Sequence, residues 1–351
     1  MGSRVVVRAD ATPQIGSGHV VRLLGLVDEL LDRSVAVELV GTVSIPWVRD
    51  LLDRRAVTPV DAPATAAGTA RLCLDLGAGA AVLDGYDLPA DLGATLRAAG
   101  LRVLSVRDGG FGAGQEADLV LDQNLGAQAA PVPGTTMLLG ERYTLFRDEV
   151  LHATTAEWPG GEGTPRVLAF FGGSDPFGAA EVLTPVVLSA VQSVDLVVVT
   201  PDEDIARSLR GLPRTEAQHL TVSAPRPDLL SVARSADAVV TATGSSVWEL
   251  LLHGVPFACV QVADNQEHGY RHLVGRGLTV GLGSLHDLRT RPAAVRTAAE
   301  RTRLLLAGPS DAVRRGRGII DGRGRARVAD ALLAHPAVTT VTRRPPSQET
   351  P

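Results

Sequence analysis

The sequence contains no lysine, and all 34 of its basic residues are arginine. It therefore has neither the lysine of a P-loop nucleotide site nor an amine that could form a Schiff base, which excludes two common classes of enzyme. Cysteine is almost as scarce, with only Cys73 and Cys259, each in an apolar segment. Two isolated cysteines build neither a disulfide framework nor a zinc site, so we expect both to be core residues.

Long apolar runs and a strong net charge are also absent. No segment reaches the roughly 18 consecutive apolar residues typical of a transmembrane helix, so we expect no membrane span. The first residues read as a strand and not as a signal peptide, which favours a cytoplasmic location. A formal net charge of −5 over 351 residues does not favour binding to nucleic acid. The length allows two domains, each with its own core.

The first half of the chain alternates apolar segments with helical ones. Strands are predicted at residues 4–8, 35–40, 80–84, 102–107 and 119–121, and helices at 19–32 and 90–99. The strand segments are solid runs of Val, Leu and Ile, which is typical of a parallel sheet covered on both faces. We therefore expect an N-terminal Rossmann-like domain over residues 1–156.

A second α/β unit follows a break in the pattern. Residues 157–165, "EWPGGEGTP", are rich in Gly and Pro and indicate a linker. Strands are predicted at 167–171, 195–199, 220–222, 238–241, 255–262 and 279–282, and helices at 179–191, 246–252, 266–275, 292–306 and 325–333. This predicts a C-terminal Rossmann-like domain over 166–335 and a disordered tail over 336–351. Parallel sheets bind ligands at the carboxyl ends of their strands, so a cleft between the domains is the expected site.

His19 directly follows the turn formed by Gly16, Ser17 and Gly18, at the start of a predicted helix. The small residues let the backbone approach a ligand, and the helix start supplies free N–H groups. Val21 stands where a dinucleotide fingerprint needs its third glycine, so that site is not predicted. The positive end of a helix disfavours a protonated imidazole, and a neutral imidazole facing a cleft can act as a general base. A structural, hydrogen-bonded histidine is the alternative.

Polar groups also follow several other predicted strands. "VLDGYD" presents Asp84, Tyr86 and Asp87, which could recognise hydroxyls or simply cap a turn; "GGSDP" contains Gly173 and Ser174, which could bind an anion or form an ordinary tight turn. "TGSSVWE" places Gly244, Ser245 and Ser246 at a helix start, where they could cradle a phosphate, and Glu249 one turn later, where it could accept hydrogen bonds from a vicinal diol such as ribose. An N-cap serine and a solvated glutamate would fit the same pattern.

One further strand end, "VADNQ", brings Asp264, Asn265 and Gln266 to the same edge of the second sheet. His268 and His272 follow at a spacing of four residues on a predicted helix. They lack a third ligand at a recognisable spacing, so we predict no metal site.

Seven segments, in order from Arg8 to Gln266, together resemble one enzyme family: "RADATPQIGSGHVVR", "VLDGYD", "ADLVLDQN", "GERYTLFRDE", "GGSDP", "TGSSVWELLLHGVP" and "VADNQ". They are similar to the UDP-2,4-diacetamido-2,4,6-trideoxy-β-L-altropyranose hydrolases of pseudaminic acid biosynthesis, which have relatives in spore-coat polysaccharide synthesis. The resemblance implies the GT-B fold, with two Rossmann-like domains facing across a cleft and UDP held mainly by the second. It implies hydrolysis of the anomeric C–O bond with inversion, without metal or cofactor.

Carried onto this sequence, the resemblance makes His19 the general base for water. It adds two further catalytic residues, Tyr86 near the sugar and Asn265 beside the sugar or the diphosphate. The substrate-binding or UDP-binding residues that we expect are Gly16, Ser17, Gly18, Arg22, Gly173, Ser174, Gly244, Ser245, Ser246, Glu249, Asp264 and Gln266. Because UDP is already a good leaving group, the reaction needs an oriented water, a base and donors for the diphosphate more than it needs a general acid.

The chain departs from the family pattern in three places. Arg107, Asp108, Gly109 and Gly110 stand where paired acids are usual, Thr243 opens the diphosphate loop in place of glycine, and the residues after His19 lack the usual methionine. These changes concern the identity of the sugar and the nucleobase. A glycosyltransferase that delivers the sugar to a hydroxyl acceptor is the main alternative, followed by a non-catalytic nucleotide-sugar sensor and a 2-epimerase.

Overall fold

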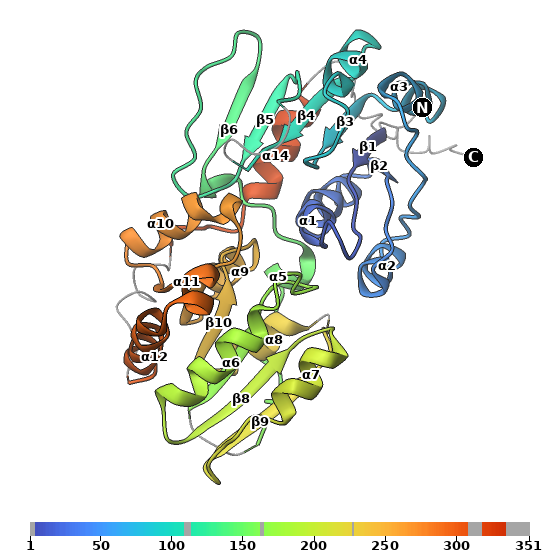
Figure 1. Cartoon of the computed structure of the whole chain (residues 1–351). Helices are drawn as coiled ribbons and strands as arrows, with labels where there is room; N and C mark the ends of the chain where they lie inside the picture. The colour runs from blue at the N-terminus through green and yellow to red at the C-terminus, as the bar shows by residue number, and fades with distance from the viewer. Residues whose placement is uncertain (1–3, 109–113, 162–164, 227, 308–317, 335–351) are drawn as a thin grey trace, which may run out of the picture.

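The computed structural model describes residues 4–108, 114–161, 165–226, 228–307 and 318–334. These residues form two parallel six-stranded sheets, with strand orders β2-β1-β3-β4-β5-β6 and β12-β11-β10-β7-β8-β9. Figure 1 shows the first sheet and its helices above the second. Each sheet has helices on both faces, which explains why its central strands are apolar along their whole length.

The first sheet contains the predicted strands and one more. The strands are β1 Arg4–Arg8, β2 Ala36–Val40, β3 Ala80–Leu83, β4 Arg102–Val106, β5 Leu119–Asp122 and β6 Thr136–Leu139, and the helices are α1 Gly18–Asp32, α2 Pro46–Asp53, α3 Ala66–Asp75 and α4 Leu92–Ala98. The sequence did not predict β6, α2 or α3. β6 is an edge strand with one buried residue, so it lacks the solid apolar run of its neighbours.

The second sheet likewise confirms the predicted strands. They are β7 Arg166–Phe170, β8 Val194–Val199, β9 Gln218–Ser223, β10 Ala238–Ala242, β11 Phe257–Gln261 and β12 Val280–Ser284. The helices are α6 Ala179–Ala190, α7 Glu203–Arg210, α8 Leu229–Ala233, α9 Ser246–His253, α10 Glu267–Gly275, α11 Leu285–Thr290 and α12 Pro292–Leu306. Of these, α7, α8 and α11 are short and were not predicted.

The last described helix, α14 (Gly324–Leu333), crosses back to the first domain. Val328, Ala329 and Leu332 are buried in the core beneath β1 and α1, and Figure 1 shows α14, in red, beside β4 and β5. We expected this helix to close the second domain. Its buried residues instead pack in the core of the first domain, where α14 contacts α1.

A second segment crosses in the opposite direction. The short helix α5 (Asp148–Leu151) precedes the expected linker, yet Phe146, Val150 and Trp158 are buried in the core of the second domain. Each domain is therefore completed by a piece of the other half of the sequence. Part of the expected linker, residues 162–164, and the expected tail over 336–351 lie outside the described residues.

None of the helices in the described ranges combines the length and the apolar character that crossing a lipid bilayer requires.

Candidate active site

Two adjoining cavities lie between the domains, at the carboxyl ends of the strands. The polar cavity has a volume of about 340 Å³ and is lined by His19, Arg22, Tyr86, Asp108, Asn124, Asn265 and other residues. The aromatic cavity has a volume of about 250 Å³, and its lining includes Trp47, Phe170 and Phe171. Gly18, Gly244, Ser245 and Gln266 line both cavities. One elongated ligand could therefore occupy both, with its middle against the start of α9.

His19 faces the polar cavity from the first turn of α1. The helix begins at Gly18, and Ser17 stands at the N-cap without a side-chain cap. The His19 side chain is buried, and its ring meets the Tyr86 ring edge-on, with centroids 4.7 Å apart and planes at 87°. Within the described part of the chain, no hydrogen bond occupies its ring nitrogens. The expectation of a histidine presented to the cleft fits this geometry better than a capping role does.

Arg22, one turn after His19, is held by two carboxylates. Its Nε donates to Asp84 Oδ2 at 2.6 Å, its Nη2 donates to Asp84 Oδ1, and its Nη1 donates to Asp108 Oδ1 at 2.7 Å. The side chains of Arg22 and Asp84 are 8% and 1% exposed. We expected Arg22 to contact substrate, but these contacts use most of its donors. Its position indicates an internal cation that fixes two strand ends to α1.

Asp108 connects this ion pair to the second domain. Tyr86 Oη donates to Asp108 Oδ2 at 2.6 Å, and Asn265 Nδ2 donates to Tyr86 Oη at 3.1 Å. Asn124 Nδ2 also approaches Asp108 Oδ1, at 3.3 Å. Because Asn265 belongs to the short helix η2 (Asp264–Gln266) of the second domain, the Tyr86–Asn265 hydrogen bond crosses the cleft. The chain of contacts from Arg22 to Asn265 therefore links both sides of the polar cavity.

The same contacts decide which groups could exchange a proton. Burial opposes ionisation of Asp108, but the charge and hydrogen bonds of Arg22, together with the Tyr86 hydroxyl, outweigh it and lower the pKa of this carboxyl to about 2. Burial and the neighbouring Asp108 carboxylate raise the pKa of the Tyr86 phenol well above its ordinary value. Asp108 therefore stays ionised and Tyr86 stays protonated near neutral pH. Neither side chain is therefore able to take up a proton readily in that range.

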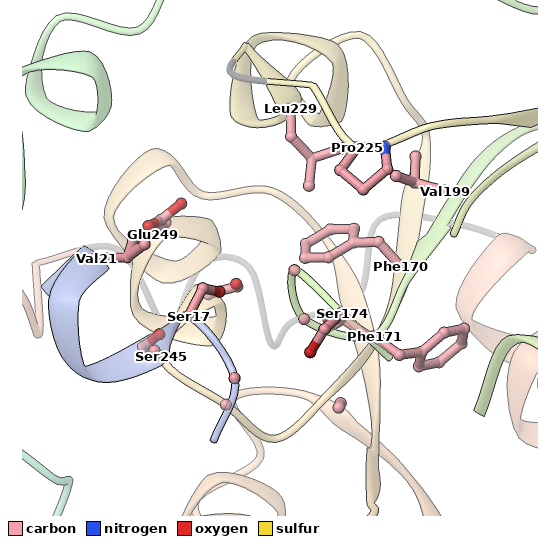
Figure 2. A pocket seen from close by; sticks show the side chains of 18 of the residues that line it. Ser17, Val21, Phe170, Phe171, Ser174, Val199, Pro225, Leu229, Ser245 and Glu249 are labelled. Atoms are coloured by element: carbon pink, nitrogen blue, oxygen red, sulfur yellow. The ribbon is translucent and has the colours of Figure 1, made fainter. Parts of the chain in front are cut away.

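The aromatic cavity has one apolar side and one polar side. Figure 2 shows Phe170, Val199, Pro225 and Leu229 on one side, with Ser17, Ser245 and Glu249 across from them. Glu249 is not solvated as an exposed helix residue would be: its Oε1 accepts a hydrogen bond from Arg147 Nη1 at 2.6 Å. An apolar wall, a carboxylate and a cluster of hydroxyls at a helix start match the base, the ribose and the phosphates of a nucleotide, in that order.

The residues of the "GGSDP" turn have two different positions, one at the start of a helix and the others at the cavity. Asp175 caps α6, because its carboxylate accepts hydrogen bonds from the N–H groups of Ala179 and Ala180 at 2.8 and 2.9 Å. Gly173 and Ser174 line the aromatic cavity instead. A Cβ on Gly173 would lie only 2.5 Å from Trp47 Cζ2 and 2.6 Å from Ser17 Oγ. Glycine is therefore needed here for close contact between the two domains.

No known family profile matches the chain, and no curated protein matches it. Solved structures do match. MurG from Acinetobacter baumannii superposes with a TM-score of 0.68 over 95% of this chain and 100% of its own, at 16% identity. S. aureus MnaA, solved with UDP, gives 0.58 over 96% and 98%, at 11% identity. The glycosyltransferase SsfS6 from Streptomyces sp. SF2575, solved with thymidine diphosphate, gives 0.52 over 89% and 98%, at 16% identity.

The chain has the GT-B fold. At these identities the likeness shows the fold alone.

Most of the expected site residues lie together in this GT-B cleft. His19, Tyr86 and Asn265 line the polar cavity, as does Arg22 of the expected substrate-binding or UDP-binding residues. The others of that expected set that line the aromatic cavity are Gly16, Ser17, Gly18, Gly173, Ser174, Gly244, Ser245, Ser246, Glu249 and Gln266. Asp264 is exposed and lines neither of these two cavities. Thr243 donates its hydroxyl to the Val260 carbonyl at 3.1 Å, so it has a structural contact. Gly109 and Gly110 lie outside the described residues.

Four residues that line one of the two cavities were not among the predicted site residues: Asp108, Asn124, Arg147 and His268. The sequence analysis named Asp108 only as a departure from the family pattern, and His268 only in weighing a metal site. Asn124 and Arg147 belong to segments that carried the family resemblance, "ADLVLDQN" and "GERYTLFRDE", and each follows a strand or a short helix. The resemblance therefore covered both residues, but it assigned no role to either. Among the described residues, no group of three or more His, Cys, Asp or Glu side chains could hold a metal ion.

Proposed function

We propose that this GT-B protein hydrolyses a nucleoside-diphosphate sugar, with a UDP-linked deoxyamino sugar as the expected substrate. The UDP bound to MnaA and the thymidine diphosphate bound to SsfS6 support a pyrimidine nucleoside diphosphate as the ligand of the aromatic cavity. The volume of the adjoining polar cavity, about 340 Å³, suits a sugar. The family resemblance of the motifs supports water as the acceptor.

The position of His19 is the observation that carries the proposal. It faces the polar cavity where that cavity meets the start of α9, and the acid–base groups around it are committed to Arg22 and to each other. Asp108, with a pKa of about 2, is too weak a base, and the Tyr86 hydroxyl stays protonated and donates a hydrogen bond to Asp108. His268 also lines this cavity, but His19 is the histidine that stands at the start of α1 beside Tyr86, so we assign it as the acceptor of the water proton.

In the proposed reaction, a water molecule attacks the anomeric carbon from the face opposite the nucleotide, which inverts the configuration. The new bond forms between the water oxygen and the anomeric carbon, and the electron pair of the breaking C–O bond goes to the diphosphate. His19 takes the proton of the water. The N–H groups at the start of α9 and the hydroxyls of Ser245 and Ser246 stabilise the charge that develops on the leaving diphosphate.

Transfer to a hydroxyl acceptor is the second candidate function, and the likeness to the glycosyltransferase SsfS6 over 98% of that chain favours it. The same base could deprotonate an acceptor hydroxyl in place of water. The two functions differ in what they need besides the nucleotide sugar.

The test is turnover of a panel of UDP-, dTDP- and CMP-linked deoxyamino sugars, with and without a cell extract as a source of acceptors. Free sugar and nucleotide released without acceptor support the hydrolase. Turnover that appears only with the extract supports the transferase. Binding of the nucleotides without turnover under either condition would overturn both and leave a nucleotide-sugar sensor.

Replacing Gly173 with alanine is expected to lower kcat/KM for the substrate found by this panel by about 100-fold. The added methyl group would force Trp47 and Ser17 away from the loop and hold the domains apart. Gly275→Ala is the matched control, because Gly275 is exposed, lines neither cavity and has nothing within 4 Å of a Cβ placed there. Equal activities of the two variants would show that the contact between Gly173 and Trp47 is unimportant.

A further inference from the structure

Glu249, the proposed ribose ligand, is paired with an arginine from the other half of the chain. Arg147 Nη1 donates to Glu249 Oε1 at 2.6 Å, and the two side chains are only 14% and 17% exposed. Both line the aromatic cavity. Arg147 Nε has no hydrogen-bond partner and lies 3.9 Å from Glu149 Oε2, so Glu249 is the closer of the two carboxylates beside this guanidinium.

Arg147 is held against α9 by its neighbours in the chain. It stands at the N-cap of α5, and its neighbours Phe146 and Val150 are buried in the core of the second domain. His253, at the end of α9, hydrogen-bonds the Val150 carbonyl through Nε2 at 2.7 Å. Residues 146–150 therefore contact the helix that carries Glu249, and they also contact the first domain, because the Asp148 N–H donates to Asp28 Oδ2 at 2.8 Å.

The ion pair would reduce the repulsion between the Glu249 carboxylate and a diphosphate bound in the proposed nucleotide site. Ser245 and Glu249 are four residues apart, so they lie on the same side of the start of α9, roughly 6 Å apart at their Cβ atoms. A diphosphate beside Ser245 would therefore sit close to the Glu249 carboxylate, and the two like charges would repel. Arg226 is the other arginine that lines this cavity, and its guanidinium is bound to Asp228, with Nη2 donating at 2.7 Å.

We infer that Arg147 is a positioning residue that cancels the charge of Glu249, so that one site can bind both a ribose diol and a diphosphate. This inference rests on the proposed binding of a nucleoside diphosphate. Arg147 orients the carboxylate through Oε1 and leaves Oε2 for the ribose. Loss of Arg147 should then lower the affinity most for the ligands with the most phosphate charge. Loss of a merely structural contact would lower the affinity for every ligand of the series equally.

The experiment is calorimetric titration of the full chain with uridine, UMP and UDP, and with the thymidine series in parallel. Arg147→Gln is expected to lower the affinity for UDP by about 30-fold and the affinity for uridine by less than about 3-fold. Arg147→Gln combined with Glu249→Gln should recover about 10-fold of UDP affinity relative to Arg147→Gln alone, because the uncompensated carboxylate is gone. Arg147→Lys, which keeps the charge, should bind UDP within about 5-fold of the wild type.

Equal losses for uridine and UDP in Arg147→Gln, or a double variant no better than Arg147→Gln, would overturn the role of Arg147. The Arg147→Lys variant keeps the test decisive if Arg147→Gln fails to fold, because a charge role requires it to retain UDP binding. If the wild type binds no member of either nucleotide series, the proposed function itself fails. The two failures are thus separated by the behaviour of the wild-type protein.

Discussion

Replacing His19 with alanine is expected to lower kcat/KM for nucleotide-sugar hydrolysis by about 10³-fold, within the range typical of a lost general base. The imidazole is the group placed to accept the proton of water, and alanine cannot replace it. The affinity for UDP should change by less than about 3-fold, because the proposed nucleotide contacts lie on α9 and in the aromatic cavity. Initial rates and calorimetric titration with UDP measure the two effects.

His268 provides the comparison for this prediction, because it is the other histidine that lines the polar cavity. It lies on α10 and stacks on His272 with ring centroids 4.3 Å apart. His268→Ala is expected to cost less than about 10-fold in kcat/KM, since any contact with the sugar would be one among several. A larger loss of kcat/KM in His268→Ala than in His19→Ala would show that our assignment of the base to His19 is wrong.

Arg22→Met is expected to lower the free energy of unfolding at neutral pH by about 3–5 kcal/mol. The substitution leaves the carboxylates of Asp84 and Asp108 buried without their cation, with side-chain exposures of 1% and 16%. Urea denaturation followed by circular dichroism measures the change. Arg71→Met is the matched control, because Arg71 pairs with Asp75 on the surface of α3, and its loss should cost less than about 1 kcal/mol. A similar small cost for both variants would contradict a structural role for Arg22.

The difference in unfolding free energy between the wild type and Arg22→Met should depend on pH through Asp108. Its folded-state pKa is lowered to about 2, so the folded protein binds this proton more weakly than the unfolded chain does. The stability that Asp108 contributes is fully present above about pH 4 and is lost as the pH falls toward 2. The gap between wild type and Arg22→Met should therefore narrow as the pH falls through this window. A constant gap from pH 7 to pH 3 would show that the lost stability does not come from the ionised pair.

The catalytic residues that we predicted come from three distant segments, and they meet in one cavity. His19, Tyr86 and Asn265 each follow the end of a parallel strand, and such ends are brought together by the topology itself. A pattern of strands and polar strand ends is enough to predict that convergence. It does not predict that Tyr86 would bridge Asp108 and Asn265, since that depends on how the two domains face each other.

Other features carry no local signal. The apolar stripe of α14 predicts a helix, but it fits either core equally well, and the chain path decides which one it joins. Asp108 is a lone acid after a strand, and its importance comes from Arg22, which is 86 residues away in sequence. Arg147 and Glu249 are 102 residues apart, so neither sequence neighbourhood reveals the pair. Long-range ion pairs of this kind arise from tertiary structure and leave no periodic trace.

Hydrolysis in ¹⁸O-labelled water, with the substrate found by the panel and no acceptor present, tests the proposed chemistry most directly. Attack of water on the anomeric carbon places the label on the released sugar, and NMR of the first product should show the inverted anomer. Both products should form about 10³-fold more slowly in His19→Ala. Label in the nucleotide phosphate would instead show attack at phosphorus, and the proposed role of His19 at the anomeric carbon would be wrong.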